Sequence, residues 1–124
     1  MPRAFYNQAG PVTNVATIDT GGLQDRVAII TGGCSGLGYG YAKALVAAGC
    51  YVVLADLRPP PEPFEETQAI FVQCDVTIWE QQRAVFETAT RRSSTGKIDI
   101  VIANAGIAGP DVLSGNRNPP FVRT

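Results

Sequence analysis

Four short apolar runs recur along the chain, and turn residues bound each of them. They cover residues 27–30, 51–55, 69–74 and 98–103. A continuous apolar run between turn residues is typical of a strand that is buried on both faces, as in a parallel sheet. The pattern therefore predicts four strands of one parallel sheet.

Two longer segments between these runs have helical periodicity. The first covers 37–48 and ends before Gly49, a residue typical of the position that follows a helix. The second begins after Thr77, which forms a capping-box pattern with Glu80, and ends before Gly96. Each segment has one predicted apolar stripe, made of Leu37, Tyr41, Ala44, Leu45 and Ala48 in the first and of Ile78, Val85, Phe86 and Ala89 in the second.

The connection between the second and third predicted strands is rich in proline. Four prolines fall within residues 59–63, three of them consecutive. Proline removes a backbone donor and clashes with the preceding helical turn, so this run favours an extended polyproline segment. We expect at most one helical turn here, over 64–68, which leaves little room for a normal crossover helix.

Length and composition fit one globular domain. The 124 residues are 45% hydrophobic and 17% charged, which is typical of a folded chain rather than a disordered one. The net charge of −1 gives no electrostatic reason to expect nucleic acid or a membrane surface as partner. The pattern divides the chain into an irregular lead-in (1–22), a regular α/β region (23–109) and an irregular, turn-rich tail (110–124).

Histidine and cysteine content narrows the chemistry further. The sequence has no histidine, which excludes a Ser-His-Asp triad and most zinc sites. Its three cysteines, Cys34, Cys50 and Cys74, are an odd number without metal-ligand spacing, so we expect neither a disulfide framework nor a metal site. We also find no signal-peptide pattern and no apolar run of membrane-spanning length. The expected location is therefore a reducing compartment, the cytoplasm.

A glycine-rich loop separates the first predicted strand from the first predicted helix. It covers residues 31–38, with the sequence TGGCSGLG. Gly32 and Gly36 would supply a tight turn and close backbone approach to a pyrophosphate, and the helix start would present free N–H groups to it. Gly38 would let the helix lie close to the strand. The loop lacks Gly-Lys-Ser/Thr, which excludes an NTPase P-loop. The alternative to a pyrophosphate-binding loop is a glycine-rich turn that binds no ligand.

Asp56 ends the second predicted strand and gives a second, independent indication of a dinucleotide site. A carboxylate at this position accepts hydrogen bonds from ribose hydroxyls and repels a 2′-phosphate. Arg58 is close, but the glycine loop contains no basic residue. The balance favours NAD over NADP as cofactor. The alternative is a solvated acid that starts a turn.

Together these motifs resemble one known family, the short-chain dehydrogenases/reductases in their non-extended branch. The family's pattern is matched by Thr31-Gly32-x-x-x-Gly36-x-Gly38, Asp56, Asp75-Val76 and Asn104-Ala105-Gly106, in this order and on these elements. The resemblance runs from about residue 23 to 109. It implies one half of a Rossmann-type α/β fold, with four parallel strands in the order 3-2-1-4 and helices on both faces.

The resemblance also implies a role for each matching residue. Asp56 would select the adenosine ribose, Asp75 would hydrogen-bond the adenine amino group, and Val76 would lie beside the ring. The cofactor's diphosphate would be lined by Gly32, Ser35, Gly36, Leu37 and Gly38. The fourth strand would end next to the cofactor at Asn104, Ala105 and Gly106. As alternatives, Asp75 is a helix-entry acid near Thr77, and residues 104–106 are an ordinary turn.

The family's chemistry is hydride transfer between a nicotinamide and an alcohol or ketone. Its acid/base is the tyrosine of a Tyr-x-x-x-Lys pair on a later helix, assisted by a serine. The sequence after Gly106 has no tyrosine or lysine, and Ser114 is its only serine. Tyr39 and Lys43 form a literal Tyr-x-x-x-Lys, but their helix would lie beside the diphosphate rather than the nicotinamide. We therefore predict no catalytic residue in this chain.

Three interpretations of the function stay open. In the first, the chain is a truncated NAD(P)-dependent oxidoreductase, whose alcohol or ketone substrate binds only to a complete form. In the second, it is a non-catalytic dinucleotide-binding module. In the third, it is a non-functional remnant. In each of them the outer edge of the fourth strand, 98–103, is apolar and lacks a neighbouring strand. Such an edge is expected to promote self-association.

Overall fold

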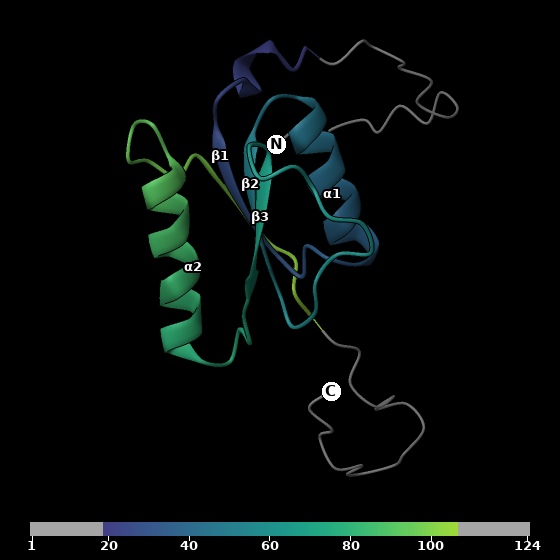
Figure 1. The fold of residues 1–124 in the computed structure, drawn as a ribbon, viewed down its shortest axis with the longest axis vertical. Coiled ribbons are helices and arrows are strands. Elements are labelled where there is room, and N and C mark those ends of the chain that lie inside the picture. Colours follow the sequence, from purple (N-terminus) through teal and green to yellow (C-terminus); the bar gives the residue numbers. More distant parts are fainter. Residues whose placement is uncertain (1–18, 107–124) are drawn as a thin grey trace, which may run out of the picture.

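The computed structural model describes residues 19–106, which form a four-stranded parallel sheet between two helices (Figure 1). The strands are β1 (Val27–Thr31), β2 (Tyr51–Asp56), β3 (Ala69–Gln73) and β4 (Ile100–Ala103). The helices are α1 (Gly36–Ala47) and α2 (Trp79–Arg92), and a short 3-10 turn, η1 (Gly21–Leu23), precedes β1. The sheet order is β3-β2-β1-β4. The predicted fold class and strand order are confirmed.

Most of the two irregular ends predicted from the sequence lies beyond this part of the chain. Residues 1–18 of the lead-in and the whole tail at 110–124 are outside the described residues. The last residues of the predicted lead-in take part in η1 rather than in irregular structure. The fourth strand begins at Ile100, two residues later than predicted.

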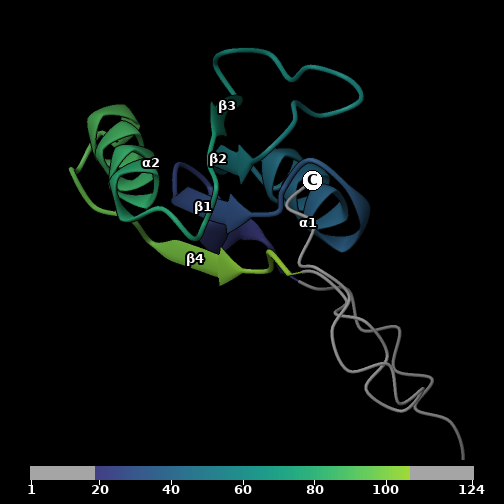
Figure 2. The same ribbon diagram turned by 90° about the horizontal axis from the view of Figure 1, so that it is seen from below.

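The core consists of two apolar layers, one on each face of β1 and β2. From β1, Ala28 and Ile30 pack on the side of α1, whereas Val27 and Ile29 pack on the side of α2. Figure 2 shows the two helices on opposite faces of the sheet. Burial on both faces explains why these strands appear in the sequence as continuous apolar runs.

The apolar stripe predicted for α1 is wrong by about one position. Leu37 and Tyr41 are 72% and 42% exposed, while Gly38 and Ala42 face the sheet and are buried. Leu45, which the stripe included, packs partly against the core. The reason is limited space: a Cβ atom at Gly38 would overlap its neighbours, and the Ala42 side chain is fully buried, so only very small side chains fit on this face of the first two turns.

Helix α2 follows its predicted stripe in part, but its predicted capping box is absent. Val85 and Ala89 are buried, whereas Phe86 is 42% exposed. The position before the helix is occupied by Ile78, and no side chain caps the helix there. Thr77 instead donates its hydroxyl to the Asp75 carboxylate at 2.6 Å.

The proline-rich connection between β2 and β3 contains no helix, as predicted. A single turn at 66–68 precedes β3. Phe64 packs against the core on the side of α1, and its ring meets the Tyr39 ring edge-on, with centroids 5.9 Å apart. This contact anchors the extended segment to α1.

Strand β4 forms one edge of the sheet and is tied to the start of β1 by Asp99. The Asp99 carboxylate accepts a hydrogen bond from the Val27 amide at 2.9 Å and pairs with Arg26 at 3.2 Å. The backbone hydrogen bond is the main reason why the pKa of Asp99 is lowered. On the outer part of the sheet, Val101 of β4 remains 51% exposed.

Candidate functional site

The carboxyl ends of the four parallel strands converge on a cleft of about 860 Å³. Figure 1 shows the segments that follow β1, β2 and β4 at the same end of the sheet. Segments far apart in the sequence therefore build one site, which is lined by Gly32, Cys34, Ser35, Ala55, Asp56, Leu57, Arg58, Pro59, Pro61, Cys74, Asp75, Val76, Thr77, Asn104, Ala105 and Gly106.

Most of the residues singled out from the sequence line this cleft. They are Gly32, Ser35, Asp56, Asp75, Val76, Asn104, Ala105 and Gly106. The other three, Gly36, Leu37 and Gly38, do not line it and instead form the first turn of α1, next to Ser35. The N–H groups of a first helical turn have no partner inside the helix. They are available to an anionic ligand placed at the helix start.

The glycine loop has the left-handed turns that its composition predicts. Gly32 has φ +65° and Gly36 has φ +53°. The Gly32 amide donates to the Ala55 carbonyl at 2.7 Å, which extends the pairing of β1 with β2. A methyl group added at Gly36 would meet nothing within 4 Å. The backbone at the start of α1 is therefore open to the approach of a ligand.

At Gly38, α1 packs directly against the glycine loop and the residue that follows β4. A Cβ atom at this position would overlap the Gly32 carbonyl oxygen and crowd the side-chain amide of Asn104. Only glycine fits here without displacing the loop or the residue that follows β4. The predicted role of Gly38 in close helix packing agrees with this geometry.

The residues after β4 hold the end of β1 and the glycine loop in place through two hydrogen bonds. The Asn104 side-chain amide donates to the Gly32 carbonyl at 3.2 Å, and the Ala105 amide donates to the Thr31 hydroxyl at 3.1 Å. Thr31 belongs to the sequence motif, but no role in the site was predicted for it. A threonine that ends a buried strand directly before a glycine loop is the feature that indicates such a role.

Asp56 joins the end of β2 to the glycine loop. One carboxylate oxygen accepts a hydrogen bond from the Cys34 amide at 3.0 Å, and the other accepts from the Leu57 amide at 2.7 Å. Each oxygen of an ionised carboxylate has two lone pairs. The group thus keeps acceptor capacity for ligand hydroxyls while its position is fixed.

Asp75 is fixed by Thr77 at the entry to α2. One carboxylate oxygen accepts from the Thr77 amide at 2.9 Å and from the Thr77 hydroxyl. The Asp75 amide donates to the Gln81 side chain at 2.7 Å. The helix-entry interpretation of Asp75 therefore describes real contacts. These contacts also hold its carboxylate at the wall of the cleft.

The cysteine in the glycine loop is a buried thiol. Cys34 is 4% exposed, and burial, together with the charge of Asp56, raises its pKa to about 12. Both burial and the neighbouring carboxylate disfavour the charged thiolate, so the thiol stays protonated. Cys50 and Cys74 are also buried.

Three other kinds of feature would indicate a different function for the described residues: a metal site, a membrane-spanning helix and a catalytic Tyr39–Lys43 pair. Between residues 19 and 106 there is no cluster of three metal-ligating side chains. No helix of this part of the chain is both long and apolar enough to cross a bilayer. Tyr39 and Lys43 lie outside the cleft lining, and the Lys43 ammonium sits 4.7 Å from the centre of the Tyr39 ring.

The sequence did not reveal the wall that the proline-rich segment contributes. Leu57, Pro59 and Pro61 line the cleft beside Asp56, together with Arg58. Their position directly after β2 could have indicated this role, because in parallel sheets the residues that follow each strand gather at the ligand-binding edge.

The family model, the related sequences and the similar solved structures all point to one family of dehydrogenases. Residues 26–119 match the short chain dehydrogenase family. The chain is 44% identical over 95 residues to the 5'-hydroxyaverantin dehydrogenase of Emericella nidulans, covering 74% of this chain and 31% of that protein. The ligand-free aldohexose dehydrogenase of Thermoplasma acidophilum superposes with a TM-score of 0.63 and 29% identity, covering 72% of this chain and 32% of that one.

Two further relatives differ in the cofactor that their names state. The NADP-dependent dehydrogenase M3 of a Phoma species is 36% identical over 94 residues, which are 73% of this chain and 27% of that protein. The NAD-dependent 15-hydroxyprostaglandin dehydrogenase of Bos taurus is 35% identical over 94 residues, 68% of this chain and 35% of that protein. The chain spans about a third of the length of the curated relatives that it matches.

Proposed function

We propose, since the chain belongs to the short-chain dehydrogenase family, that residues 23–109 are the dinucleotide-binding half of an NAD-dependent oxidoreductase. In such enzymes the bound nicotinamide supplies the hydride chemistry, and the protein binds and orients it. The proposed reaction of the complete protein is hydride transfer between the nicotinamide and a small alcohol or ketone. The observation that carries this proposal is the cleft at the strand ends, where the glycine loop and the Asp56 carboxylate meet.

The proposed placement of the cofactor follows the geometry of the cleft. The diphosphate contacts Ser35 and the first turn of α1, where Gly36 leaves open space and the helix presents its free amides. The adenosine ribose donates its hydroxyls to Asp56. Asp75 and Val76 hold the adenine. The turn at 104–106 borders the nicotinamide side and supports the loop through Asn104.

NAD is favoured over NADP because a 2′-phosphate would approach a fixed carboxylate. Asp56 is held by two backbone amides, so it cannot rotate away from an added phosphate without losing both hydrogen bonds. Arg58 also lines the cleft and would partly offset this repulsion. The expected result is a preference for NAD rather than complete exclusion of NADP.

Catalytic turnover is proposed only for a form that contains the family's acid/base residues. After the turn at 104–106 the sequence has no tyrosine and no lysine, and its only serine is Ser114. The chain as it stands is therefore proposed to bind the dinucleotide without turning over an alcohol. A non-catalytic binding module and a non-functional remnant remain the alternatives that the experiment below separates.

Self-association and a cytoplasmic location complete the proposal. The outer edge of β4 has no neighbouring strand within the described residues, and Val101 on it is 51% exposed. Unpaired apolar edges recruit other strands. We therefore expect copies of the chain to pair through β4. The cytoplasmic location rests on the three free cysteines.

Energy transfer from the single tryptophan to NADH tests the proposal directly. Trp79 is 68% exposed and begins α2, two residues after the cleft residue Thr77. Quenching of Trp79 that saturates with NADH at a lower concentration than with NADPH is the expected result, without turnover of any alcohol. Absence of binding in a folded chain would contradict the proposal. Absence of binding together with aggregation would support a non-functional remnant, and robust turnover would overturn the statement that catalytic residues are missing.

A further inference from the structure

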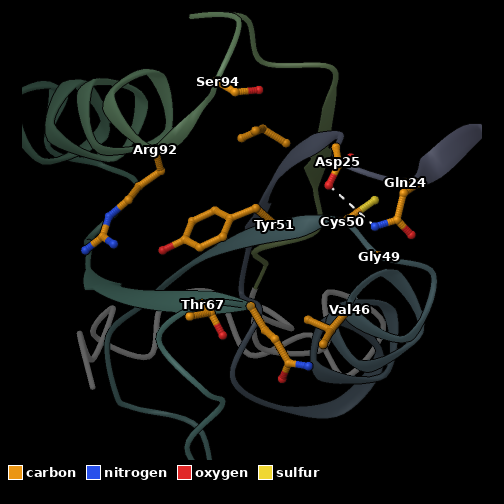
Figure 3. A pocket seen from close by; sticks show the side chains of 11 residues that line it. Gln24, Asp25, Val46, Gly49, Cys50, Tyr51, Thr67, Arg92 and Ser94 are labelled. Atoms are coloured by element: carbon orange, nitrogen blue, oxygen red, sulfur yellow. Dashed lines mark hydrogen bonds between the residues drawn. The ribbon is translucent and has the colours of Figure 1, made fainter.

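A second hollow, of about 630 Å³, lies at the opposite end of the sheet from the cofactor cleft (Figure 3). It is formed where β1 and β2 begin and where α1 and α2 end. No residue that lines it also lines the cofactor cleft. The hollow is therefore a separate candidate site, and the family's cofactor does not account for it.

The Tyr51 side chain crosses this hollow and ends in a hydroxyl without a partner. The hydroxyl oxygen is buried and forms no hydrogen bond within the described residues. A buried polar group without a partner is costly, so such groups in native proteins usually have a reason. Burial is the main cause that raises the pKa of the Tyr51 phenol. The positive charge of Arg92 lowers this pKa, and the negative charge of Glu66 raises it. The group therefore stays protonated and remains a hydrogen-bond donor.

Arg92 places a cation at the same end of the hollow as this hydroxyl. Its guanidinium carbon lies 5.9 Å from the centre of the Tyr51 ring, and Figure 3 shows both groups on the side of α2. Arg92 forms no ion pair with any residue in the range 19–106. A guanidinium and a phenolic O–H that converge are a suitable pair of donors for a carboxylate. Because the Arg92 side chain is exposed, it can rotate to admit a ligand to the hydroxyl.

The other end of the hollow carries negative charge. Asp25 and Gln24 lie there, next to the turn at Gly49, and the Asp25 carboxylate contacts the Gln24 amide at 3.4 Å (Figure 3). Asp25 is in no ion pair among the described residues. The C-terminal end of α1, which carries a partial negative charge, borders the same end at Val46. This end is suited to a cation.

We propose that the hollow binds an elongated zwitterion, an ω-amino carboxylate. Its carboxylate binds Arg92 and the Tyr51 hydroxyl, and its ammonium group binds Asp25. The Tyr51 side chain points from the end at Asp25 towards the end at Arg92 (Figure 3), so a ligand whose two charges are joined by a methylene chain can lie along the Tyr51 ring and reach both ends. The methylene groups of that chain pack on the Tyr51 ring and on Val46.

Titration of the 124-residue chain with ε-aminocaproate, followed by amide and side-chain NMR shifts, tests this proposal. Saturable shifts centred on Tyr51, Arg92 and Asp25 are expected. Caproate lacks the ammonium and hexylamine lacks the carboxylate, so each should bind about tenfold more weakly or worse, because one charged hydrogen-bonding end is lost. This ligand series needs no variant and does not depend on binding of the dinucleotide.

Three variants sharpen the test. Tyr51→Phe removes only the unpartnered hydroxyl, so it should leave the apo fold as stable as before and still weaken ε-aminocaproate binding by about tenfold. Asp25→Asn keeps a residue that tolerates the left-handed backbone at φ 61° and should bring the affinity down to that of caproate. Arg92→Gln should weaken binding, whereas its exposed neighbour Arg91→Gln should not. Equal binding of the three compounds, equal effects of Arg91→Gln and Arg92→Gln, or no saturable shift would each overturn the proposal.

Discussion

The Asp56 carboxylate accepts a hydrogen bond from the Cys34 amide at 3.0 Å, which ties the end of β2 to the glycine loop. The same group that is proposed to bind the ribose therefore also fixes the loop that is proposed to hold the diphosphate. The two subsites of the cofactor are coupled through one side chain. Substitutions at Asp56 should affect both affinity and loop order.

Asp56→Asn is expected to weaken NADH binding by about tenfold and to bring the NADPH affinity closer to that of NADH. Asparagine keeps one oxygen that accepts from Cys34, but it lacks the charge that strengthens ribose hydrogen bonds and repels a 2′-phosphate. Quenching of Trp79 by each cofactor measures both effects. An unchanged ratio of the two affinities would contradict the proposed role.

Gly38→Ala is expected to lower the free energy of unfolding by about 1–3 kcal/mol, because its methyl group would overlap the Gly32 carbonyl. It should also abolish dinucleotide binding by displacing the loop. Gly40→Ala is the matched control, because nothing lies within 4 Å of its added methyl group and the position is inside α1. This control should raise stability by about 0.5–1 kcal/mol. Urea unfolding of both variants measures the difference.

Asp99→Asn is expected to lower stability at neutral pH and to lose that effect in acid. The folded-state pKa of Asp99 is lowered, mainly by the Val27 amide. The carboxylate therefore stabilises the fold above its ordinary pKa of 3.8, and this contribution disappears as the pH falls through the lower folded value. Urea midpoints of the wild type and the variant should converge over this acidic range. A gap that persists unchanged would contradict the assignment.

Cys34 is expected to resist alkylation in the folded chain. With its pKa at about 12, the thiol is almost entirely protonated near neutral pH, and burial blocks access as well. Its reaction with iodoacetamide should be at least about a hundredfold slower in the native than in the urea-unfolded chain. Peptide mass spectrometry resolves its rate from those of Cys50 and Cys74. A native rate equal to the unfolded one would show that the loop opens.

Val101→Lys is expected to shift the chain towards the monomer. A lysine on an edge strand opposes pairing with a second strand. Tyr41→Lys, on the exposed side of α1, replaces another exposed apolar residue away from this edge and should leave self-association unchanged. Sedimentation velocity at several concentrations distinguishes the two variants. A monomeric wild-type chain would contradict the proposed pairing through β4.

The sequence predicted the strands, their order and most of the residues around the cleft. These features follow from apolar runs and from motifs whose glycines and carboxylates have strong local reasons. The buried face of α1 was predicted wrongly, because hydrophobicity points to Leu37 and Tyr41 while the close approach of the helix selects Gly38 and Ala42. Periodicity cannot reveal that distance.

Contacts between distant segments were also outside the reach of the sequence. Asn104 donates to the Gly32 carbonyl across 72 residues of sequence. The bond of Asp99 to Val27 joins residues that no local pattern connects. The wall made by Pro59 and Pro61 depends on where Phe64 anchors the segment, which is a tertiary contact.

The hydrogen bond from Asn104 to Gly32 has a consequence for synthesis of the chain. The glycine loop emerges from the ribosome early, but the amide that braces it is made 72 residues later. A nascent chain that stops short of Asn104 has the loop's sequence without its support, and β4 has not yet joined the sheet. We expect dinucleotide affinity to appear late during translation, when the turn after β4 leaves the exit tunnel.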